Sequence, residues 1–532
     1  MYPGLVIVSN RLPVSVKKTD GKLEFYPSIG GLATGLSTYT SNKRNRWIGW
    51  PGIANEDINE DERRTITKEL KKHNCYPVFL SQKELDGFYN GFANSVLWPL
   101  LHDLTPNKEA AADESFWRAY KRVNQAFGEV VLSLSTSGTT IWVHDYQLML
   151  LPSMLRVQRP HDKIGFFLHI PFPSSKIFAN APHGAELLGG LAGADLLGFH
   201  TTSYVQNFLS CCQHFDIGTV GPKELILPDR VIRVTDFPMG IDYAKFVRAT
   251  KQAAVRRELL KLRTKYRGKK VIVSVDRMDV TKGIVPRLDA YRAFLEQNPQ
   301  FHRKVVLVMI AIPSRTDTDA YKKLRKQIDD LVHDIEDKFG TARWKPIEYI
   351  TTPLSFTQLS PYFQLADIAL VTPIRDGMNL VAKEYIASQG NQDGILVLSK
   401  TAGAAEELKQ AIIVDPTKRS SLVSGIKEAM LLPQDELRER VSAMQDHISE
   451  FTVQEWASNF MGTLKKPVKT PHMTRSLSPS HQRMLVDSFR RAQKRLLLLD
   501  YDGVLAPFRS NPYKAGPSPK VLKVLRKLAK LP

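Results

Sequence analysis

Short, almost continuously apolar runs alternate with helical patterns along most of this chain, and this alternation constrains its fold more than any other feature. A first series of runs lies at residues 6–8, 47–50, 140–143, 164–168 and 196–199. A second series lies at residues 271–275, 305–310, 347–350, 368–372 and 395–398. Runs that are apolar at nearly every position are typical of strands covered on both faces. The sequence therefore predicts an α/β protein with two β/α domains of similar size.

The alternation also indicates where the domains end. It pauses around residues 238–242, and its last helical stretch, residues 453–464, carries Trp456 and Phe460 on one face. A link that contains Ser, Pro and Thr follows and has neither helical nor strand periodicity. Residues 496–499 are four leucines, which predict the first strand of a partial third α/β domain.

Charge is distributed unevenly along the chain. The formal net charge is +20, but the residues from Lys465 onward hold sixteen Lys and Arg against three Asp and so carry +13. The preceding 464 residues carry only +7, which is compatible with small phosphorylated substrates. The basic tail has no recognisable nucleic-acid reading motif and no array of stacking aromatic residues. The charge therefore does not predict a nucleic acid as the main ligand.

Cysteine content and hydropathy indicate the compartment. The three cysteines are Cys75, Cys211 and Cys212, and the last two are sequence neighbours that are poorly placed for a disulfide framework. A reducing cytoplasm fits this content best. The first apolar run is too short for a signal-peptide core, and no run approaches membrane-spanning length. We therefore expect a cytoplasmic protein without a membrane segment.

Residues 374–384, Ile-Arg-Asp-Gly-Met-Asn-Leu-Val-Ala-Lys-Glu, join a predicted strand to a predicted helix through a short turn that contains glycine. The N-terminus of such a helix presents unpaired N–H groups at the carboxyl end of a strand, where open α/β sheets bind ligands. Asp376 then lies beside the ligand, and Glu384 can reach a ribose while the amides hold a diphosphate. The segment predicts an anion site.

Asp145 and His169 each follow an apolar strand in the first series. Strand ends of doubly wound domains face the cleft, so both residues belong to one candidate site. Three further residues give weaker signals. Gly31, in a Gly-Gly-Leu turn, permits close backbone approach to a phosphoryl group, and the aromatic faces of Tyr89 and Trp98 suit sugar rings.

Four cations also follow predicted strands. Arg277 and Lys282 lie five residues apart on one loop and suit the neutralisation of a diphosphate leaving group. Fixed cations stabilise the negative charge on a departing phosphate more in the transition state than before it. Arg11 and Arg315 end strands in opposite domains and can converge on a separate phosphate.

Several common catalytic motifs are absent from the sequence. It has no Walker-type phosphate loop, no Cys/His zinc spacing and no nucleophile-elbow serine. Neither ATP hydrolysis of the Walker class nor a metal site in the first two domains is predicted.

Taken together and in this order, these segments resemble the trehalose-6-phosphate synthases, a family of retaining glucosyltransferases with the two-domain GT-B fold. The resemblance covers about residues 5–464, and the motifs that carry it are residues 9–14, 30–32, 142–146 and 169–173, Arg277 with Lys282, and residues 375–384. It implies two Rossmann-like β/α/β domains that face a cleft. The acceptor-binding domain is expected at 1–240, the nucleotide-sugar-binding domain at 241–450 and a helix crossing back to the first domain at 451–464.

The resemblance also implies roles for the matching positions. The acceptor, glucose 6-phosphate, is expected to bind Arg11, Tyr89, Trp98, Asp145 and Arg315, with the two arginines on its phosphate. The donor, UDP-glucose, is expected to bind Gly31, His169, Arg277, Lys282, Leu354, Asp376, Met378, Asn379, Leu380, Val381 and Glu384. The expected catalytic group is Asp145, His169, Arg277, Lys282 and Asp376. Within the donor site, Glu384 is expected on the ribose, Leu354 beside the uracil, and Asp376 and His169 on glucose hydroxyls.

The family forms an α,α-1,1 bond with retention, and the resemblance implies that glucosyl transfer needs no metal or other cofactor. A retaining glycosidase uses two carboxylates, one of them as the nucleophile. Here the resemblance implies a front-face displacement in which a donor phosphate oxygen accepts the proton of the acceptor hydroxyl. The protein then supplies orientation and charge stabilisation, with closure of the two domains around both substrates.

The tail, residues 484–532 after a linker at 465–483, resembles the opening of a haloacid-dehalogenase-type trehalose-6-phosphate phosphatase. Asp500 matches the nucleophile and Asp502 the general acid/base of its Asp-x-Asp-Gly motif, whereas Val504 stands where Thr is usual. The sequence ends before the downstream Lys and acidic cluster that would complete a Mg²⁺ site. We expect a truncated, inactive phosphatase-like segment, with Mg²⁺ needed only by a complete domain.

Three alternatives stay open at the level of the sequence. One is a related glucosyltransferase that uses ADP- or GDP-glucose, or glycerol 3-phosphate as acceptor. Another is a catalytically silent subunit that senses sugar phosphates, although the intact Arg11, Asp145, Arg277, Lys282, Arg315 and Asp376 argue against it. The third is nucleic-acid binding by the basic tail. The oligomeric state, a homo-oligomer included, is not readable from the sequence.

Overall fold

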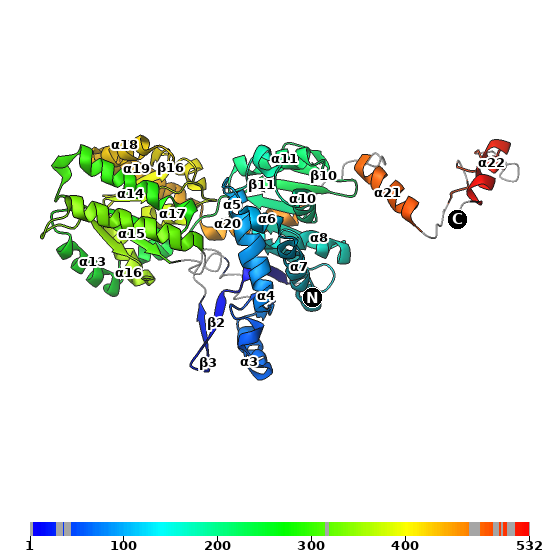
Figure 1. Cartoon of the computed structure of the whole chain (residues 1–532), viewed down its shortest axis with the longest axis horizontal. Coiled ribbons are helices and arrows are strands. Elements are labelled where there is room, and N and C mark those ends of the chain that lie inside the picture. Colours follow the sequence, from blue (N-terminus) through cyan, green and yellow to red (C-terminus); the bar gives the residue numbers. More distant parts are fainter. Residues whose placement is uncertain are drawn as a thin grey trace. The chain divides into compact units, whose positions relative to one another are not determined.

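The computed structural model describes residues 4–27, 36, 44–313, 319–467, 479–492, 499–501, 504–507 and 516–530. The chain forms two compact units, Met1–Lys469 and Thr470–Pro532. The first unit contains two α/β lobes, each built on a mainly parallel sheet (Figure 1). The predicted α/β class is therefore confirmed.

The sheet of the first lobe has the strand order β5-β4-β1-β6-β7-β8-β11-β10-β9. Its strands are β1 (Leu5–Arg11), β4 (Arg46–Trp50), β5 (Cys75–Pro77), β6 (Thr140–His144), β7 (Lys163–Phe167), β8 (Leu196–Phe199), β9 (Thr219–Val220), β10 (Glu224–Ile226) and β11 (Val231–Asp236). The pairs from β5 to β11 are parallel, and β9 and β10 add an antiparallel edge. A separate antiparallel hairpin joins β2 (Val14–Thr19) to β3 (Lys22–Pro27).

The helices of the first lobe cover both faces of this sheet. They are η1 (Asn55–Asp57), α3 (Glu60–Lys71), α4 (Gln82–Glu84), the π-helix η2 (Leu85–Leu97), α5 (Trp98–Leu101), α6 (Lys108–Ala112), α7 (Glu114–Leu134), η3 (Tyr146–Leu148), α8 (Leu151–Gln158), α9 (Ser175–Phe178), α10 (Gly184–Leu191) and α11 (Thr202–His214). Strand β1 is buried on both faces: Val6 and Val8 belong to a core shared with η2 and α7, whereas Leu5 and Ile7 belong to a core shared with α3. This double burial is the reason for the continuous apolar run in the sequence.

The second lobe holds a parallel sheet with the strand order β14-β13-β12-β15-β16-β17. Its strands are β12 (Lys270–Arg277), β13 (Val305–Ile312), β14 (Ile347–Ile350), β15 (Ile368–Val371), β16 (Ile395–Ser399) and β17 (Ile412–Val414). Its helices are α12 (Tyr243–Ala249), α13 (Ala253–Lys265), η4 (Val280–Lys282), α14 (Ile284–Gln297), η5 (Pro299–Phe301), α15 (Asp319–Phe339), α16 (Phe356–Leu365), α17 (Leu380–Ala387), η6 (Gly403–Glu406), α18 (Arg419–Leu431) and α19 (Gln434–Glu450). Helix α14 contacts α15 and α18, whereas α16 contacts α12 and α13, so two groups of helices cover the sheet.

The chain passes between the lobes twice, and the two passes contact each other. The N–H of Val453 donates to the carbonyl of Ile241 at 3.1 Å. A Cβ atom on Gly240 would lie 2.0 Å from the carbonyl oxygen of Phe451, so a side chain at position 240 would push the two passes apart.

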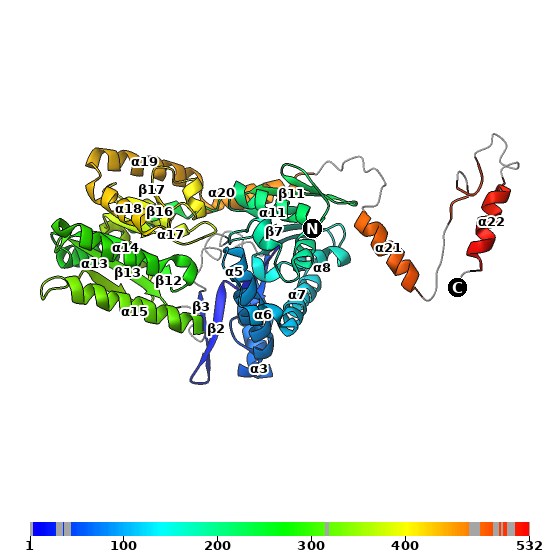
Figure 2. The ribbon, with the colours of Figure 1, turned by 45° about the horizontal axis from the view of Figure 1, so that its top comes forward.

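After the second pass, helix α20 (Val453–Lys465) packs on β7 and β8 of the first lobe (Figure 2, orange). The ring of Phe460 stacks on Trp142 with centroids 4.5 Å apart, and Trp456 lies 5.2 Å from the same ring. Strands β7 and β8 have glycines at 165 and 198 at this point, where an added Cβ would lie 2.7 and 2.8 Å from Phe460. The apolar face predicted for residues 453–464 is therefore buried against the first sheet.

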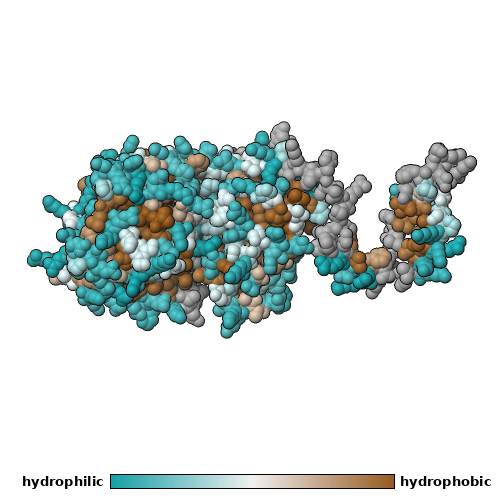
Figure 3. Space-filling model, turned by 90° about the horizontal axis from the view of Figure 1, so that it is seen from above, coloured by the Kyte–Doolittle hydropathy of each residue, from teal (hydrophilic) through white to brown (hydrophobic). Residues whose placement is uncertain are grey.

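The surface of the first unit is mainly hydrophilic on the face that Figure 3 shows, with separate hydrophobic areas. Among the described residues, no helix has an apolar stretch long enough to cross a membrane.

The second unit contains helices α21 (Pro479–Arg491) and α22 (Pro519–Leu528). Both carry exposed apolar side chains, among them Met484, Phe489 and Val524. Residues 493–498 lie outside the described residues, so the strand expected at 496–499 stays a prediction.

Candidate active site

The candidate site lies at the carboxyl edges of the two sheets, where the residues predicted from the sequence follow β6, β7, β12 and β15. Three non-glycine residues here have a positive φ: Asp103 at 60°, Asp145 at 74° and Asn379 at 71°. Such conformations cost energy in most residues and often occur at functional sites.

Asp376 is the centre of the second-lobe part of the site. Its carboxylate accepts hydrogen bonds from Nζ of Lys282 at 2.5 Å and from Nδ2 of Asn379 at 3.1 Å. Burial favours the neutral form of Asp376, but the ammonium of Lys282 outweighs it and holds the pKa below its ordinary value. The structure thus brings three predicted donor-site residues into contact, with a carboxylate that stays ionised.

The loop of Asp376 packs directly against the first lobe. A Cβ atom on Gly377 would lie 2.3 Å from the carbonyl oxygen of His169, so only glycine permits this approach. The hydroxyl of Tyr204 also donates to the carbonyl of Asp376 at 3.1 Å. In addition, Arg375 forms an ion pair with Asp103, a first-lobe residue.

Helix α17 begins at this loop as the sequence predicts. Oδ1 of Asn379 accepts a hydrogen bond from the N–H of Ala382 at 3.4 Å, whereas the N–H groups of Leu380 and Val381 have no intrahelical acceptor. These amides and the helix dipole attract an anion. The carbonyl of the buried Met378 accepts from the N–H of Ala404 at 2.8 Å, which fixes the loop.

Glu384 lies one turn further along α17. Burial raises the pKa of its carboxyl group to about 7, against the opposing charge of Lys245. Leu354, expected beside the uracil, packs half-buried against the core of the second lobe.

Arg277 and Lys282 occupy one loop but differ in their surroundings. Arg277 ends β12 with an exposed side chain, and no ion pair holds it within the described residues. Its charge acts on Asp145 in the other lobe. Lys282 is largely covered and paired with Asp376. One cation is therefore available to an incoming anion and the other is shared with a carboxylate.

Asp145 and His169 lie side by side in the first lobe. Oδ1 of Asp145 accepts from the N–H of His169 at 3.2 Å, and the N–H of Asp145 donates to the carbonyl of Phe167 at 2.8 Å. Burial raises the pKa of Asp145 to about 6, although the hydrogen bond from His169 and the charge of Arg277 oppose this rise. The carboxylate is charged at neutral pH and able to accept hydrogen bonds from sugar hydroxyls.

His169 belongs to a cluster of three histidines with His144 and His200. Nδ1 of His144 lies 3.1 Å from Nε2 of His169, and the rings of His169 and His200 are 5.7 Å apart. Burial, together with the neighbouring imidazole, holds the pKa of both His144 and His169 well below the ordinary value. The two rings are therefore neutral, and one nitrogen of the pair donates while the other accepts.

Nε2 of His144 is enclosed and has no partner in the described structure. An orphaned acceptor costs less than an orphaned N–H, so Nδ1 of His144 is the donor.

On the acceptor side, the guanidinium of Arg11 lies over the ring of Trp50, 4.4 Å from its centroid, and burial lowers the pKa of Arg11 against the opposing effect of the neighbouring Tyr89. Tyr89 lies on η2, a π-helix, which is an element often found at functional sites. Trp98 follows on α5 and packs against the ring of Tyr146, with centroids 5.7 Å apart. The structure places these three residues at the same end of the first sheet as Asp145.

Three predicted residues, Gly31, Arg315 and Asp502, lie outside the described residues. Asp500 is described and exposed, and its carboxylate accepts from the N–H of Tyr501 at 2.9 Å. Within the described ranges, no group of three or more His, Cys, Asp or Glu side chains is arranged to hold a metal ion.

Sequence reasoning missed several residues of the site. His144 and His200 complete the histidine cluster, and Asp103 pairs with Arg375. Lys383 is buried in an ion pair with Glu407 at 2.6 Å, and its Nζ also donates to the carbonyl of Met239, where the chain passes between the lobes. His144 lies within the motif at residues 142–146 and Lys383 within the motif at residues 375–384, so their places in these motifs could have indicated a role in the site. His102, next to Asp103, had no such signal.

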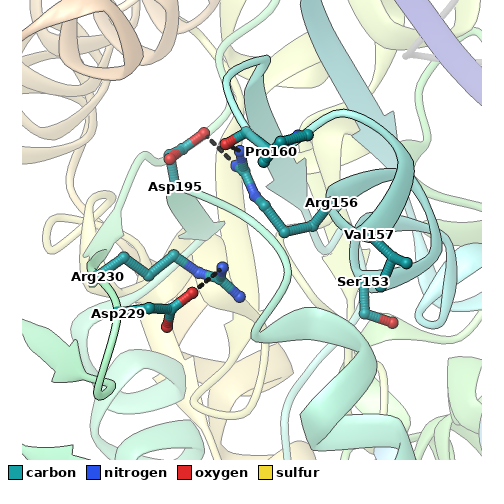
Figure 4. A pocket seen from close by; sticks show the side chains of 7 residues that line it. All are labelled: Ser153, Arg156, Val157, Pro160, Asp195, Asp229 and Arg230. Atoms are coloured by element: carbon teal, nitrogen blue, oxygen red, sulfur yellow. Dashed lines mark hydrogen bonds and ion pairs between the residues drawn. The ribbon is translucent and has the colours of Figure 1, made fainter. Parts of the chain in front are cut away.

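A hollow of about 470 Å³ lies away from this site (Figure 4). It is lined by residues of α8 and the turn after it and by residues that directly precede β8 and β11, at the amino ends of these strands. Arg156 pairs there with Asp195 at 2.7 Å and Arg230 with Asp229 at 2.9 Å. Because each guanidinium already faces a carboxylate, the hollow offers no unbalanced charge to a phosphorylated sugar.

Known proteins resemble this chain over most of its length. The model of glycosyltransferase family 20 matches residues 3–466. An alpha,alpha-trehalose-phosphate synthase (UDP-forming) A from Dictyostelium discoideum is 37% identical over 520 residues, which are 97% of this chain and 70% of the relative. A bifunctional trehalose-6-phosphate synthase/phosphatase from Thermoproteus tenax is 36% identical over 543 residues, 99% of this chain and 73% of the relative.

Solved structures agree. An alpha,alpha-trehalose-phosphate synthase (UDP-forming) from Burkholderia xenovorans in complex with glucose-6-phosphate has a TM-score of 0.76 at 31% identity, over 87% of this chain and 100% of that one. A trehalose-6-phosphate protein from E. coli, bound with UDP-2-fluoro glucose, has a TM-score of 0.76 at 34% identity, over 87% of this chain and 99% of that one. The expected GT-B arrangement of two Rossmann-like lobes is confirmed. The chain belongs to glycosyltransferase family 20.

Proposed function

We propose that the protein transfers glucose, with retention, from UDP-glucose to glucose 6-phosphate and releases α,α-trehalose 6-phosphate and UDP. The observation that carries this proposal is the joint placement of Lys282, Asp376 and the free amides of α17 at one sheet edge, facing Asp145 and His169. The solved structures that resemble this chain include one with a UDP-glucose analogue and one with glucose 6-phosphate, which supports the proposal.

On this proposal the second lobe supplies most of the donor contacts, and Gly31 and His169 of the first lobe complete them. The amides of Leu380 and Val381 and the cations Arg277 and Lys282 bind the diphosphate, and Glu384 accepts hydrogen bonds from the ribose. The remaining donor contacts are backbone at Gly31, Met378 and Asn379, the Leu354 side chain beside the uracil, and Asp376 and His169 on glucose hydroxyls.

The first lobe binds the acceptor on the same proposal. Asp145, Tyr89 and Trp98 contact the sugar of glucose 6-phosphate, and Arg11 and Arg315 bind its phosphate. An ionised Asp145 with a fixed backbone orients the acceptor hydroxyl toward the donor carbon.

The reaction that fits these groups is a front-face displacement. The bond between the donor C1 and the diphosphate oxygen breaks, the acceptor oxygen bonds to C1 from the same face, and a phosphate oxygen takes the hydroxyl proton. Asp376 is already engaged by Lys282 and Asn379, which makes it a poor nucleophile. Arg277 and Lys282 stabilise the charge that grows on UDP, and such electrostatic stabilisation is often the largest catalytic contribution. These cations make a metal or other cofactor unnecessary for transfer.

Product analysis with purified protein tests this function. UDP-glucose and glucose 6-phosphate should yield UDP and a non-reducing phosphorylated disaccharide, and Lys282→Ala should lose this activity. Parallel reactions with ADP-glucose, GDP-glucose and glycerol 3-phosphate test the related transferases. Binding of both substrates without any product would instead identify a silent sensing subunit.

We also propose that residues 484–532 correspond to the start of a haloacid-dehalogenase-type phosphatase domain without activity of its own. The alignment with the bifunctional relative from Thermoproteus tenax over 99% of this chain supports the correspondence. The exposed position of Asp500 supports the lack of activity. Release of inorganic phosphate from trehalose 6-phosphate in the presence of Mg²⁺ would contradict it.

We further propose that the protein acts in the cytoplasm on small phosphorylated sugars and not on nucleic acid. Cys75, Cys211 and Cys212 are free and buried, which fits a reducing compartment. Fractionation of the source cells tests the compartment, and loss of any nucleic-acid binding after removal of the tail would trace that binding to its charge.

A further inference from the structure

His102 brings a first-lobe imidazole to the donor side of the site. It follows α5, is 3% exposed and packs against Trp98 with ring centroids 4.2 Å apart and the ring planes tilted by 36°. The charges of Asp376 and Lys282, both in the second lobe, act on its ring. The next residue, Asp103, forms the ion pair with Arg375. His102 therefore lies where the two lobes meet beside Asp376.

One hydrogen bond fixes which nitrogen of His102 carries the proton. Nδ1 lies 2.8 Å from the carbonyl oxygen of Trp98, and a carbonyl only accepts, so Nδ1 is the N–H donor. Burial lowers the pKa of His102 to about 4, so the ring is neutral at physiological pH. Nε2 therefore presents a lone pair.

This lone pair is open. Nε2 of His102 has no hydrogen-bond partner within the described residues, and it differs from Nε2 of His144, which is fully enclosed. An acceptor in a site needs a ligand group that donates. A diphosphate and a sugar phosphate present mainly acceptor oxygens, whereas sugar hydroxyls donate. The neighbouring Asp376 and Lys282 belong to the donor side under the proposed function, which makes the donor glucose the partner.

We propose that His102 is a substrate-binding residue whose Nε2 accepts a hydrogen bond from a hydroxyl of the donor glucose. This inference rests on the proposed function of the site. The neutral His102 accepts from the sugar, while the ionised Asp376 accepts from a neighbouring hydroxyl.

Two substitutions separate the nitrogens of His102. His102→Asn keeps an N–H near the position of Nδ1, so it preserves the bond to Trp98 and removes the acceptor. His102→Gln places its amide near the position of Nε2, so it retains an acceptor and loses the bond to Trp98. We expect His102→Asn to weaken UDP-glucose binding roughly tenfold, the size of one hydrogen bond, and His102→Gln to recover part of it. His214→Asn, at an exposed histidine in the last turn of α11, is the control.

Calorimetric titration of the full-length protein with UDP and with UDP-glucose gives a readout that does not depend on turnover. UDP has no glucose, so its affinity should be equal for all variants. The affinity for UDP-glucose should differ between them. Weaker UDP binding to His102→Asn, or unchanged UDP-glucose binding, would overturn the proposal. If the wild type binds UDP-glucose but makes no disaccharide, the proposed function fails and the binding comparison still decides the role of His102.

Deoxy sugars identify the partner hydroxyl. One monodeoxy UDP-glucose should lose affinity for the wild type and show no further loss with His102→Asn, because both changes remove the same hydrogen bond. Additive losses with every deoxy donor, or coupling to a deoxy glucose 6-phosphate instead, would contradict the assignment to the donor glucose.

Discussion

Lys282 and Asp376 neutralise each other at 2.5 Å, while Arg277 on the same loop is exposed. A diphosphate that binds here therefore contacts one cation without an ion-pair partner among the described residues, Arg277, and one, Lys282, whose charge is already shared with Asp376. Removal of Arg277 takes away charge stabilisation that matters most when the bond to UDP breaks, whereas the ion pair beside it stays intact. The two cations thus differ in what their loss should change.

Arg277→Ala should mainly lower turnover, by roughly a hundredfold, a typical loss for one group that stabilises transition-state charge. Arg315→Ala should mainly raise the KM for glucose 6-phosphate, because its proposed role is to bind the acceptor phosphate. Steady-state kinetics with each substrate varied separately measures both. Lys400→Ala, which removes an exposed ion pair with Asp415, is the control, and near wild-type kinetics for both arginine variants would refute this placement.

Glu384→Gln should change the pH dependence of the protein without substrate. The folded-state pKa of Glu384, about 7, is raised above the ordinary 4.5, so its contribution to stability is fully present below 4.5 and is lost as the pH rises through 7. The melting temperature should fall less over this range in the variant than in the wild type. Glu258→Gln, an exposed surface change on α13, should leave the wild-type profile unaltered.

The same titration should affect the donor. An ionised Glu384 accepts hydrogen bonds from ribose hydroxyls better than a neutral one, so wild-type affinity for UDP-glucose should increase as the pH rises through about 7. Titrations at several pH values should show this rise in the wild type and a flat profile in Glu384→Gln. Equal slopes in both proteins would remove Glu384 from the ribose contact.

At the scale of elements, helix α20 follows the second lobe in the chain and packs on the sheet of the first lobe. Phe460→Ala should lower the free energy of unfolding by about 3–5 kcal/mol, since the ring is buried between Trp142 and two strand glycines. Denaturant unfolding measures the loss. Leu431→Ala, at a side chain that is 60% exposed, should cost little, and equal effects of the two substitutions would contradict the docking of α20.

Elements buried on both faces were predictable from the sequence because their apolar runs are nearly continuous, as in β12 and β13. The hairpin β2–β3 was not predicted, since five of its twelve positions are Lys, Thr or Glu in an exposed pattern without an apolar run. The antiparallel edge β9–β10 consists of strands of two and three residues, too short to give a period. The π-helix η2 has no simple sequence signal either.

The residues of the candidate site likewise divide into those that the sequence predicts and those that it does not. Asp376, Lys282 and Asp145 lie on the loops that follow predicted strands, so topology brings these loops to one edge. His102 and Asp103 reach the site through the irregular path of η2 and α5, and Arg375 meets Asp103 only after both lobes have folded. Periodicity does not encode such contacts between residues that are far apart in the chain.

At the scale of the whole molecule, every proposed contact that the structure describes lies in the unit Met1–Lys469. A protein that ends at Pro467 should therefore keep its glucosyl-transfer rate and its melting temperature, while its net charge becomes much less positive. Addition of a chelator should leave both the full-length and the shortened protein active, because cationic side chains replace a metal at the leaving group. A tenfold loss in either experiment would show that the tail or a metal contributes.

The side-by-side passage of the chain at Gly240 and Phe451 has a mechanical consequence. The two chain passes are the covalent connection between the lobes, whereas the ion pair of Arg375 with Asp103 and the hydrogen bond from Tyr204 to Asp376 are noncovalent and can break when the lobes separate. A reversible covalent bond between positions 103 and 375, which already form an ion pair, would then be enough to stop substrate exchange while the two chain passes stay unmodified.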